Sequence, residues 1–167
     1  DPMTLFATLA DLSAAGIDHL SMEASSIGLH QHRLDGVKVT AAGFTNLSRD
    51  HLDYHGNMDE YLRTKSYLLT DILEPNGTAV LNADVPEYEE LKGLADKRGC
   101  RILSYGRQGD TLQMIDRVPH PSGQEIALKI DDHDFKLMIP LVGEFQVMNA
   151  LCALGLAVAE HDKVVQA

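Results

Sequence analysis

The spacing of apolar residues predicts a helix at the start of the chain. Leu5, Leu9 and Leu12 recur three or four residues apart, as expected for one face of an amphipathic helix. Gly16 follows as a candidate residue for ending that helix. The pattern therefore predicts a helix over Met3–Ala15.

Short apolar runs then alternate with helical patterns up to about residue 105. This alternation is typical of an α/β fold with a doubly wound, mostly parallel sheet. The predicted strands are Ile17–Met22, Val37–Leu47, Thr78–Leu81 and Arg101–Tyr105, and the predicted helices are Asp59–Ile72 and Val85–Arg98.

The pattern changes after Tyr105, where apolar residues alternate in twos. Such alternation, interrupted by turn residues, predicts antiparallel strands. We expect a small antiparallel β element made of Thr111–Val118, Gln124–Ile130 and Phe135–Ile139. An Ala- and Leu-rich helix over Val147–Glu160 should follow, apolar nearly all round and therefore largely buried.

The composition argues against several classes of binding partner. The 167 residues include 14 Lys and Arg against 25 Asp and Glu, a net charge of −11, which argues against nucleic acid and anionic lipid as partners. An anionic nucleotide would require a divalent metal and a few basic groups. Cys100 and Cys152 lie too far apart for a zinc motif and fit a reducing cytoplasm.

The organisation of the chain predicts a single structural unit. No linker, repeat or membrane-spanning run is apparent, since the longest apolar run, Ala150–Ala159, is about half the ~20 residues that a bilayer requires. The chain opens at Asp1 without an initiator Met and enters a helical pattern almost at once. We therefore expect a fragment of a longer protein.

Polar residues follow two of the predicted strands. Glu23 follows the first, and Asn46–Gly56 follows the second; ligands bind at the carboxyl ends of strands in open α/β sheets. Within Asn46–Gly56, a cluster that could bind a metal consists of Asp50, His51, Asp53 and His55. Capping and hydrogen bonding of a loop is the alternative role for the same side chains.

Other candidate residues remain ambiguous on spacing alone. Ser25, Gln31 and Arg33 could grip a carboxylate or phosphate, or could belong to a surface loop. Lys65 resembles any solvated lysine on a helix, and Gln146 and Asn149 could simply cap the last helix. The sequence contains no GxxxxGK[ST] phosphate loop.

Four blocks of the sequence are informative when they are taken together: Met22–Leu29, Thr45–Gly56, Tyr61–Lys65 and Gly143–Ala150. In order and spacing these blocks resemble the Mur ligases, the ATP-dependent amide ligases that build peptidoglycan precursors. The resemblance covers essentially the whole chain, and the second block is the most specific.

The resemblance implies a cytoplasmic, three-domain enzyme, and we expect a monomer. Residues 1–167 correspond to the C-terminal portion of its central, ATP-binding domain, with a UDP-binding domain before and an amino-acid-binding domain after. The implied substrates are ATP, UDP-N-acetylmuramoyl-L-alanyl-D-glutamate and a diamino acid, with meso-diaminopimelate expected over L-lysine. We expect the isolated fragment to be inactive.

The resemblance also implies a role for individual residues. Glu23 and His51 match ligands of Mg²⁺, and Lys65 matches a lysine that CO2 converts into a carbamate, which helps to hold a second Mg²⁺. The positions that match contacts to the nucleotide-sugar peptide are Ser25, Gln31 and Arg33, and those that match positions near adenine are Asn149 and Gln146.

Two positions depart from the family pattern. Ile27 stands where the family more often has His, and Gln146 where it more often has Asn. Two alternatives stay open: a folylpolyglutamate synthetase-type ligase, which shares the central-domain plan, and a non-catalytic nucleotide- or metal-binding module.

Overall fold

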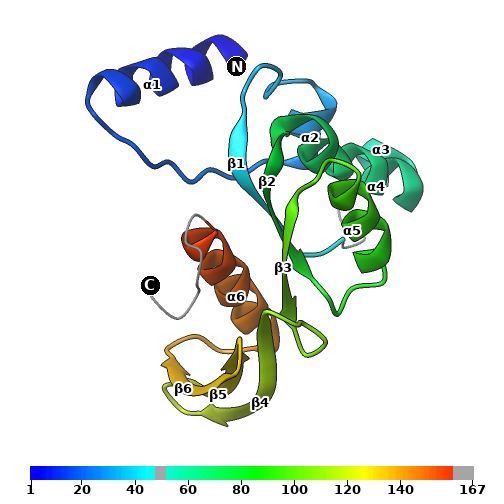
Figure 1. Ribbon diagram of the computed structural model, residues 1–167. Helices are drawn as coiled ribbons and strands as arrows, with labels where there is room; N and C mark the ends of the chain where they lie inside the picture. The colour runs from blue at the N-terminus through cyan, green and yellow to red at the C-terminus, as the bar shows by residue number, and fades with distance from the viewer. Residues whose placement is uncertain (48–51, 160–167) are drawn as a thin grey trace.

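The computed structural model describes residues 1–47 and 52–159, which form one six-stranded sheet with helices on both faces (Figure 1). The strands lie in chain order, β1 Val39–Phe44, β2 Leu73–Asn82, β3 Arg101–Gly106, β4 Leu112–His120, β5 Gly123–Ile130 and β6 His133–Ile139. The helices are α1 Pro2–Ala14, α2 Ser26–His30, α3 Leu52–His55, α4 Met58–Tyr67, α5 Tyr88–Asp96 and α6 Glu144–Val158, with a π-helical turn η1 Leu68–Ile72 after α4.

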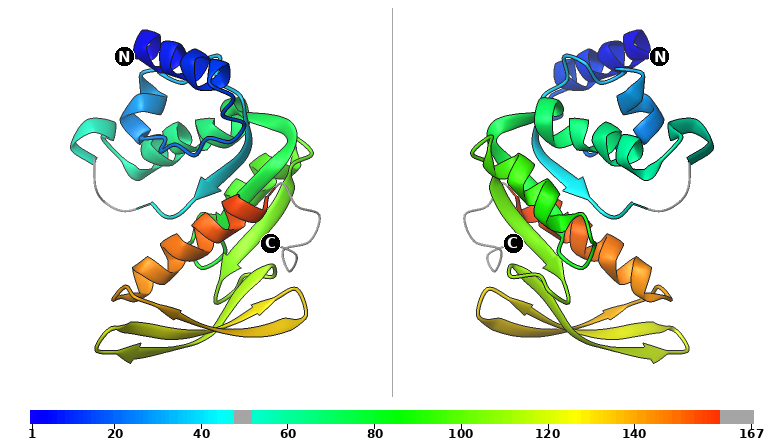
Figure 2. Two further views of the ribbon diagram at one scale, coloured as in Figure 1. Left: turned by 90° about the vertical axis from the view of Figure 1, so that its left-hand side faces the viewer. Right: turned by 90° about the vertical axis from the view of Figure 1, so that its right-hand side faces the viewer.

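The sheet has a parallel part and an antiparallel part. β1 to β4 pair in parallel, whereas β4, β5 and β6 pair in antiparallel fashion. β3 and β4 meet through only two pairs, Tyr105 with Leu112 and Gly106 with Gln113. Figure 2 shows the β4–β6 ribbon extending beyond the helices. Both the doubly wound parallel sheet and the appended antiparallel element are confirmed.

Alternate residues of β2 supply the cores on the two faces. Val80 packs in a cluster with Val147 and Leu151 of α6, whereas Ala79 and Leu81 pack with residues of η1 and α5 on the other face. Because successive side chains of a strand point to opposite faces, a central strand that is buried on both sides requires an unbroken apolar run. The sequence Ala79-Val80-Leu81 meets that requirement.

Two glycines allow α6 to approach the sheet closely. A Cβ built on Gly155 of α6 would lie 2.5 Å from a methyl carbon of Val80, and one on Gly43 of β1 would lie 2.7 Å from the sulfur of Cys152. Neither position leaves room for a side chain without movement. α6 is buried on this face only, since Ala153 and Ala157 are exposed, so the prediction of a largely buried helix is half correct.

The predicted strand Ile17–Met22 is wrong. This segment is extended but has no ladder partner among the described residues, and Ile17, Leu20 and Met22 are exposed. A strand forms only where a neighbouring strand satisfies its backbone, and an alternating pattern cannot reveal whether one is there. Glu23 therefore follows an unpaired segment rather than a buried strand.

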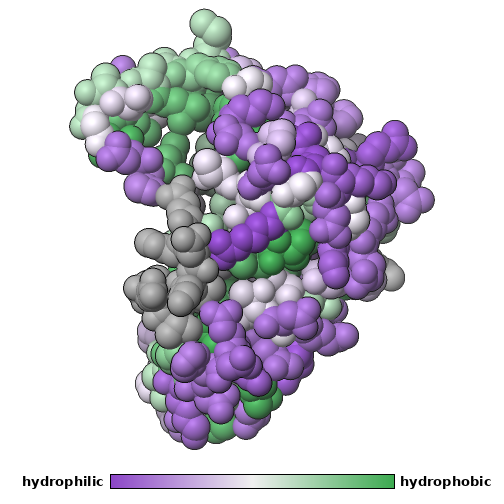
Figure 3. All heavy atoms as spheres, viewed as in Figure 1, coloured by the Kyte–Doolittle hydropathy of each residue, from purple (hydrophilic) through white to green (hydrophobic). Residues whose placement is uncertain are grey.

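α1 stands at one end of the molecule and is largely solvent-exposed. None of its residues is buried, although Leu5 and Leu9 pack against a small cluster that contains Leu29 and Leu34. Apolar side chains cover much of its outer surface (Figure 3), Met3 and Phe6 among them. In the part of the chain that the structure describes, no helix is both long and apolar enough to span a bilayer.

Candidate functional site

The loops that follow β1, β2 and β3 lie at one edge of the sheet. β1, β2 and β3 run in the same direction, so their carboxyl ends, and the residues that follow them, share an edge. The side chain of Asn82, at the end of β2, donates to the carbonyl of Thr45 after β1 at 3.0 Å. This hydrogen bond links the loop after β1 to the end of β2.

Lys65 of α4 reaches the same edge. Its ammonium donates to the carbonyl of Asn46 at 2.9 Å and lies over the rings of Phe44 and Tyr61, 4.9 and 5.5 Å from their centroids. Partial burial lowers the pKa of Lys65 below its ordinary value of 10.5, and the Glu23 carboxylate opposes part of that shift. Lys65 is thus a half-buried amine within the electrostatic reach of Glu23.

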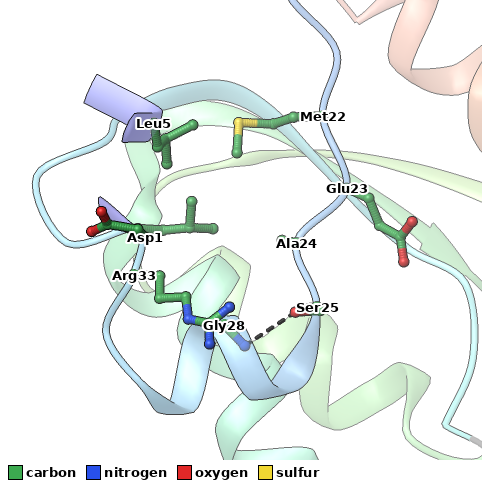
Figure 4. A pocket seen from close by; sticks show the side chains of 9 residues that line it. Asp1, Leu5, Met22, Glu23, Ala24, Ser25, Gly28 and Arg33 are labelled. Atoms are coloured by element: carbon green, nitrogen blue, oxygen red, sulfur yellow. Dashed lines mark hydrogen bonds between the residues drawn. The ribbon is translucent and has the colours of Figure 1, made fainter. Parts of the chain in front are cut away.

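A pocket of about 200 Å³ lies between the start of α1 and the segment around α2. Glu23, Ser25 and Arg33 contribute to its lining, together with Asp1 and Leu5 of the α1 region (Figure 4). The Glu23 carboxylate points away from the Arg33 guanidinium in this view. The pocket thus gathers three of the predicted site residues around a polar surface.

Ser25 and Arg33 are held by local hydrogen bonds. Ser25 caps α2, because its hydroxyl accepts from the backbone N–H of Gly28 at 3.1 Å. The exposed Arg33 guanidinium donates to the side-chain carbonyl of Gln31 at 2.5 Å. Gln31 in turn donates to the hydroxyl of Tyr54 at 3.4 Å. Gln31 and Arg33, which follow α2, are therefore linked to each other and to Tyr54 of α3, whereas Ser25 is held at the start of α2.

His55 is buried and already engaged by protein groups. Its Nε2 lies 3.0 Å from the hydroxyl of Ser26, and its ring stacks on Tyr61 with centroids 4.8 Å apart. The capping and hydrogen-bonding alternative therefore fits His55 better than metal binding. His51 and Asp50 lie outside the described residues, and residues 1–47 and 52–159 hold no group of three His, Cys, Asp or Glu side chains arranged for a metal.

Gln146 and Asn149 lie on α6, near its start. Glu144, in the first turn, forms an ion pair with Arg107, which follows β3, with Nε and Oε1 3.1 Å apart. This ion pair brings the beginning of α6 to the carboxyl edge of the sheet. Lys65 of α4 therefore approaches the same edge as Gln146 and Asn149 of α6, but from a different helix. Neither Gln146 nor Asn149 lines the pocket that contains Arg33.

Comparison with known proteins identifies the family. The sequence model described as the Mur ligase middle domain matches residues 1–157. The chain belongs to the Mur ligase family.

The relatives share a name and extend well beyond this chain. A curated protein of Agrobacterium fabrum is 45% identical over 161 residues, and one of Zymomonas mobilis is 40% identical over 166 residues. Both are named "UDP-N-acetylmuramoyl-L-alanyl-D-glutamate--2,6-diaminopimelate ligase". The matches cover 95% and 99% of this chain but 32% and 34% of the relatives, so the chain spans about a third of their length.

A solved structure supports the same assignment. The structure of a UDP-N-acetylmuramoyl-L-alanyl-D-glutamate--2,6-diaminopimelate ligase superposes with a TM-score of 0.85 at 31% identity, covering 96% of this chain and 33% of that one. The mixed sheet with helices on both faces is thus the fold of the Mur ligase middle domain.

Asp84 also lies at the carboxyl edge of the sheet, although no role for it was predicted from the sequence pattern. Asp84 follows β2 and accepts hydrogen bonds from the backbone N–H groups of Arg107 and Gln108, at 2.7 and 2.8 Å. Gly106 permits this approach, since a Cβ there would lie 2.6 Å from the Asp84 carboxylate. The sequence did contain an indication of this role. Asp84 lies two residues after a buried strand, where its carboxylate can accept hydrogen bonds from the backbone of a neighbouring loop.

Proposed function

We propose that the protein to which this chain belongs is an ATP-dependent amide ligase that adds a diamino acid, meso-diaminopimelate, to UDP-N-acetylmuramoyl-L-alanyl-D-glutamate. The observation that supports this most directly is the 40 to 45% identity, over almost the whole chain, to curated ligases named for that reaction. Residues 1–167 would form the later part of the central domain of a cytoplasmic, monomeric enzyme.

The proposed reaction proceeds in two steps. A carboxylate of the D-glutamyl residue attacks the γ-phosphorus of ATP, which forms an acyl phosphate and releases ADP. The amine of the diamino acid then attacks the acyl carbon, forms the amide bond, loses a proton and expels inorganic phosphate. The first step brings a carboxylate to an anionic phosphate, and the second expels another anion, so the protein must neutralise charge and fix geometry.

Arg33, Ser25 and Gln31 are suited to binding the nucleotide-sugar peptide. A guanidinium presents a planar fork of N–H donors to a carboxylate or phosphate, and Arg33 is exposed at the pocket with its orientation fixed by Gln31. Ser25 holds the start of α2 beside it. Gln146 and Asn149 would contact adenine from the first turns of α6, where Gln146 keeps the amide group usual at its position.

Lys65 is suited to carbamate formation. Only the neutral amine attacks CO2, forming an N–C bond and releasing a proton, and a lowered pKa enlarges the neutral fraction at physiological pH. The product carries a negative charge where the amine carried a positive one. The nearby Glu23 would then need a cation between the two anions.

Mg²⁺ meets that need, and its donor set fits the chemistry of these side chains. Mg²⁺ prefers oxygen ligands, which the Glu23 carboxylate and a Lys65 carbamate would supply. His51 would add a nitrogen ligand, which the resemblance to the family implies. When bound, the ion supplies charge neutralisation for the phosphate groups.

The experiment that tests the function is phosphate release by the full-length protein with ATP, Mg²⁺ and UDP-N-acetylmuramoyl-L-alanyl-D-glutamate. We expect release that depends on meso-diaminopimelate and not on L-lysine. Dependence on L-lysine would correct the acceptor. No release with either would overturn the proposal in favour of folylpolyglutamate synthetase-type chemistry or a non-catalytic module.

The carbamate has a test of its own. Lys65→Ala should abolish most of the phosphate release, and short-chain carboxylic acids should restore part of it by supplying the missing anion. A rate equal to that of the unsubstituted protein would contradict the role of Lys65. His51→Ala should raise the Mg²⁺ concentration that half-maximal activity requires, and an unchanged titration would favour a capping role.

A further inference from the structure

Ser26 and His55 connect two segments that are far apart in the sequence. Ser26 begins α2 and His55 ends α3, 29 residues later, yet the Ser26 hydroxyl and His55 Nε2 lie 3.0 Å apart. Both residues are buried, at 7% and 8% exposure. A hydrogen bond between buried partners is costly to break, because neither group regains water easily.

Aromatic rings fix the direction in which His55 Nε2 points. The imidazole stacks on Tyr61 at an interplanar angle of 12°. Tyr54 and His30 meet the same ring edge-on, at centroid distances of 4.9 and 6.0 Å. With contacts on its face and its edges, the ring has little freedom to rotate away from Ser26.

Each end of this contact adjoins a residue of the proposed site. On one side, Ser26 directly follows Ser25, and α2 leads on to Gln31 and Arg33. On the other side, the Tyr61 ring that supports His55 also lies beneath the Lys65 ammonium, 5.5 Å from it. A continuous series of contacts thus runs from Ser26 through His55 and Tyr61 to Lys65.

We propose that Ser26 and His55 are positioning residues that fix the nucleotide-sugar-binding segment around α2 relative to Lys65. Neither touches the reacting atoms. Their hydrogen bond sets the distance between the groups that hold the D-glutamyl end of the substrate and the anion that Lys65 would provide. This role rests on the proposed ligase function and adds to it two residues that act through others.

The test compares single and double variants of the full-length protein. Ser26→Ala removes only a hydroxyl, and His55→Phe keeps an aromatic ring for stacking but has no ring nitrogen to hydrogen-bond. Each should raise the KM for UDP-N-acetylmuramoyl-L-alanyl-D-glutamate roughly two- to tenfold, the loss expected for one hydrogen bond, with less effect on the KM for ATP. The double variant should be little worse than either single one, because both remove the same bond.

Two further variants separate positioning from general stability. His55→Gln, whose amide nitrogen can reach the place of Nε2, should restore part of the lost affinity. Ser66→Ala is the matched control, since Ser66 is also buried on this side of the molecule and its hydroxyl has no hydrogen-bond partner among the described residues. It should leave both KM values unchanged.

The outcomes are distinguishable. An active unsubstituted enzyme whose KM values do not change in Ser26→Ala and His55→Phe would overturn the positioning role alone. The positioning role is also overturned if both variants lower the melting temperature and affect the two KM values equally. An inactive unsubstituted enzyme would overturn the proposed function and this role with it.

Discussion

Gly155 and Gly93 both lie inside helices, but only Gly155 faces a packed neighbour. A Cβ at Gly155 of α6 would lie 2.5 Å from a methyl carbon of Val80, whereas a Cβ at Gly93 of α5 would meet nothing within 4 Å. Substituting each glycine with alanine therefore makes the same chemical change in two different surroundings.

The two variants share one energetic term and differ in another. Alanine is favoured over glycine in a helix interior by about 1 kcal/mol, and this gain applies to both positions. Carbon atoms in contact prefer about 3.5 to 4.0 Å, so at Gly155 the added methyl group must displace something by about 1 Å. Val80 is fully buried on a strand paired on both sides, and overpacking of this kind costs about 1 to 3 kcal/mol.

We therefore expect Gly93→Ala to be more stable than the unsubstituted protein by up to about 1 kcal/mol. Gly155→Ala should be less stable than Gly93→Ala by about 1 to 3 kcal/mol. Urea unfolding followed by far-ultraviolet circular dichroism would measure both differences in the same background. Equal stabilities, within the roughly 0.5 kcal/mol typical of surface substitutions, would refute the close approach of α6 to β2.

Three other predictions follow from contacts described above. Arg33→Lys should raise the KM for the UDP-sugar dipeptide more than the KM for ATP, because lysine lacks the planar fork; equal effects would indicate a folding defect. Gln124, which is 1% exposed, donates to the carbonyls of Leu141 and Gly143 at 2.8 and 2.9 Å, so Gln124→Leu should lower the free energy of unfolding by about 2 to 4 kcal/mol; a loss below the spread of surface substitutions would contradict that importance. The hydrogen bond from Arg107 lowers the pKa of Glu144 below its ordinary 4.5, so the stability that Glu144 contributes is present above pH 4.5 and lost as the pH falls through the lowered pKa. In urea titrations Glu144→Gln should therefore lose less stability than the unsubstituted protein on acidification, and parallel pH profiles would show that the pair contributes nothing.

Elements with strong periodicity were predictable because the spacing of apolar residues indicates directly which residues of a helix or strand face the core. The alternation in residues 111–139 predicted the β4–β6 ribbon, and the apolar run Thr78–Leu81 predicted a strand that became the C-terminal half of β2. The segment Ile17–Met22 has a similar pattern but no partner in the described chain. Pairing depends on residues far away in sequence, so the pattern of this segment could not decide it.

The site was predictable only as a set of residue types. The helical pattern gave no reason to distinguish Lys65 from a solvated lysine, because its lowered pKa arises from the burial that packing imposes. His55 was predicted within a cluster that could bind metal or cap a loop, but its neighbour in space is Ser26, 29 residues upstream. The resemblance to the Mur ligases suggested roles for these residues where spacing alone left alternatives open.

The narrow join between β3 and β4 has a consequence for local unfolding. Only two ladder pairs join β4 to β3, and backbone pairing this short would by itself let the β4–β6 ribbon open as a separate unit. However, Ile126 and Leu128 of β5 belong to the same buried cluster as Val147 and Leu151 of α6. Opening β5 therefore requires α6 to lose its contacts, which ties its amide protection to the central core. β6, which is largely exposed along its length, can exchange its amide protons while β5 and α6 stay closed.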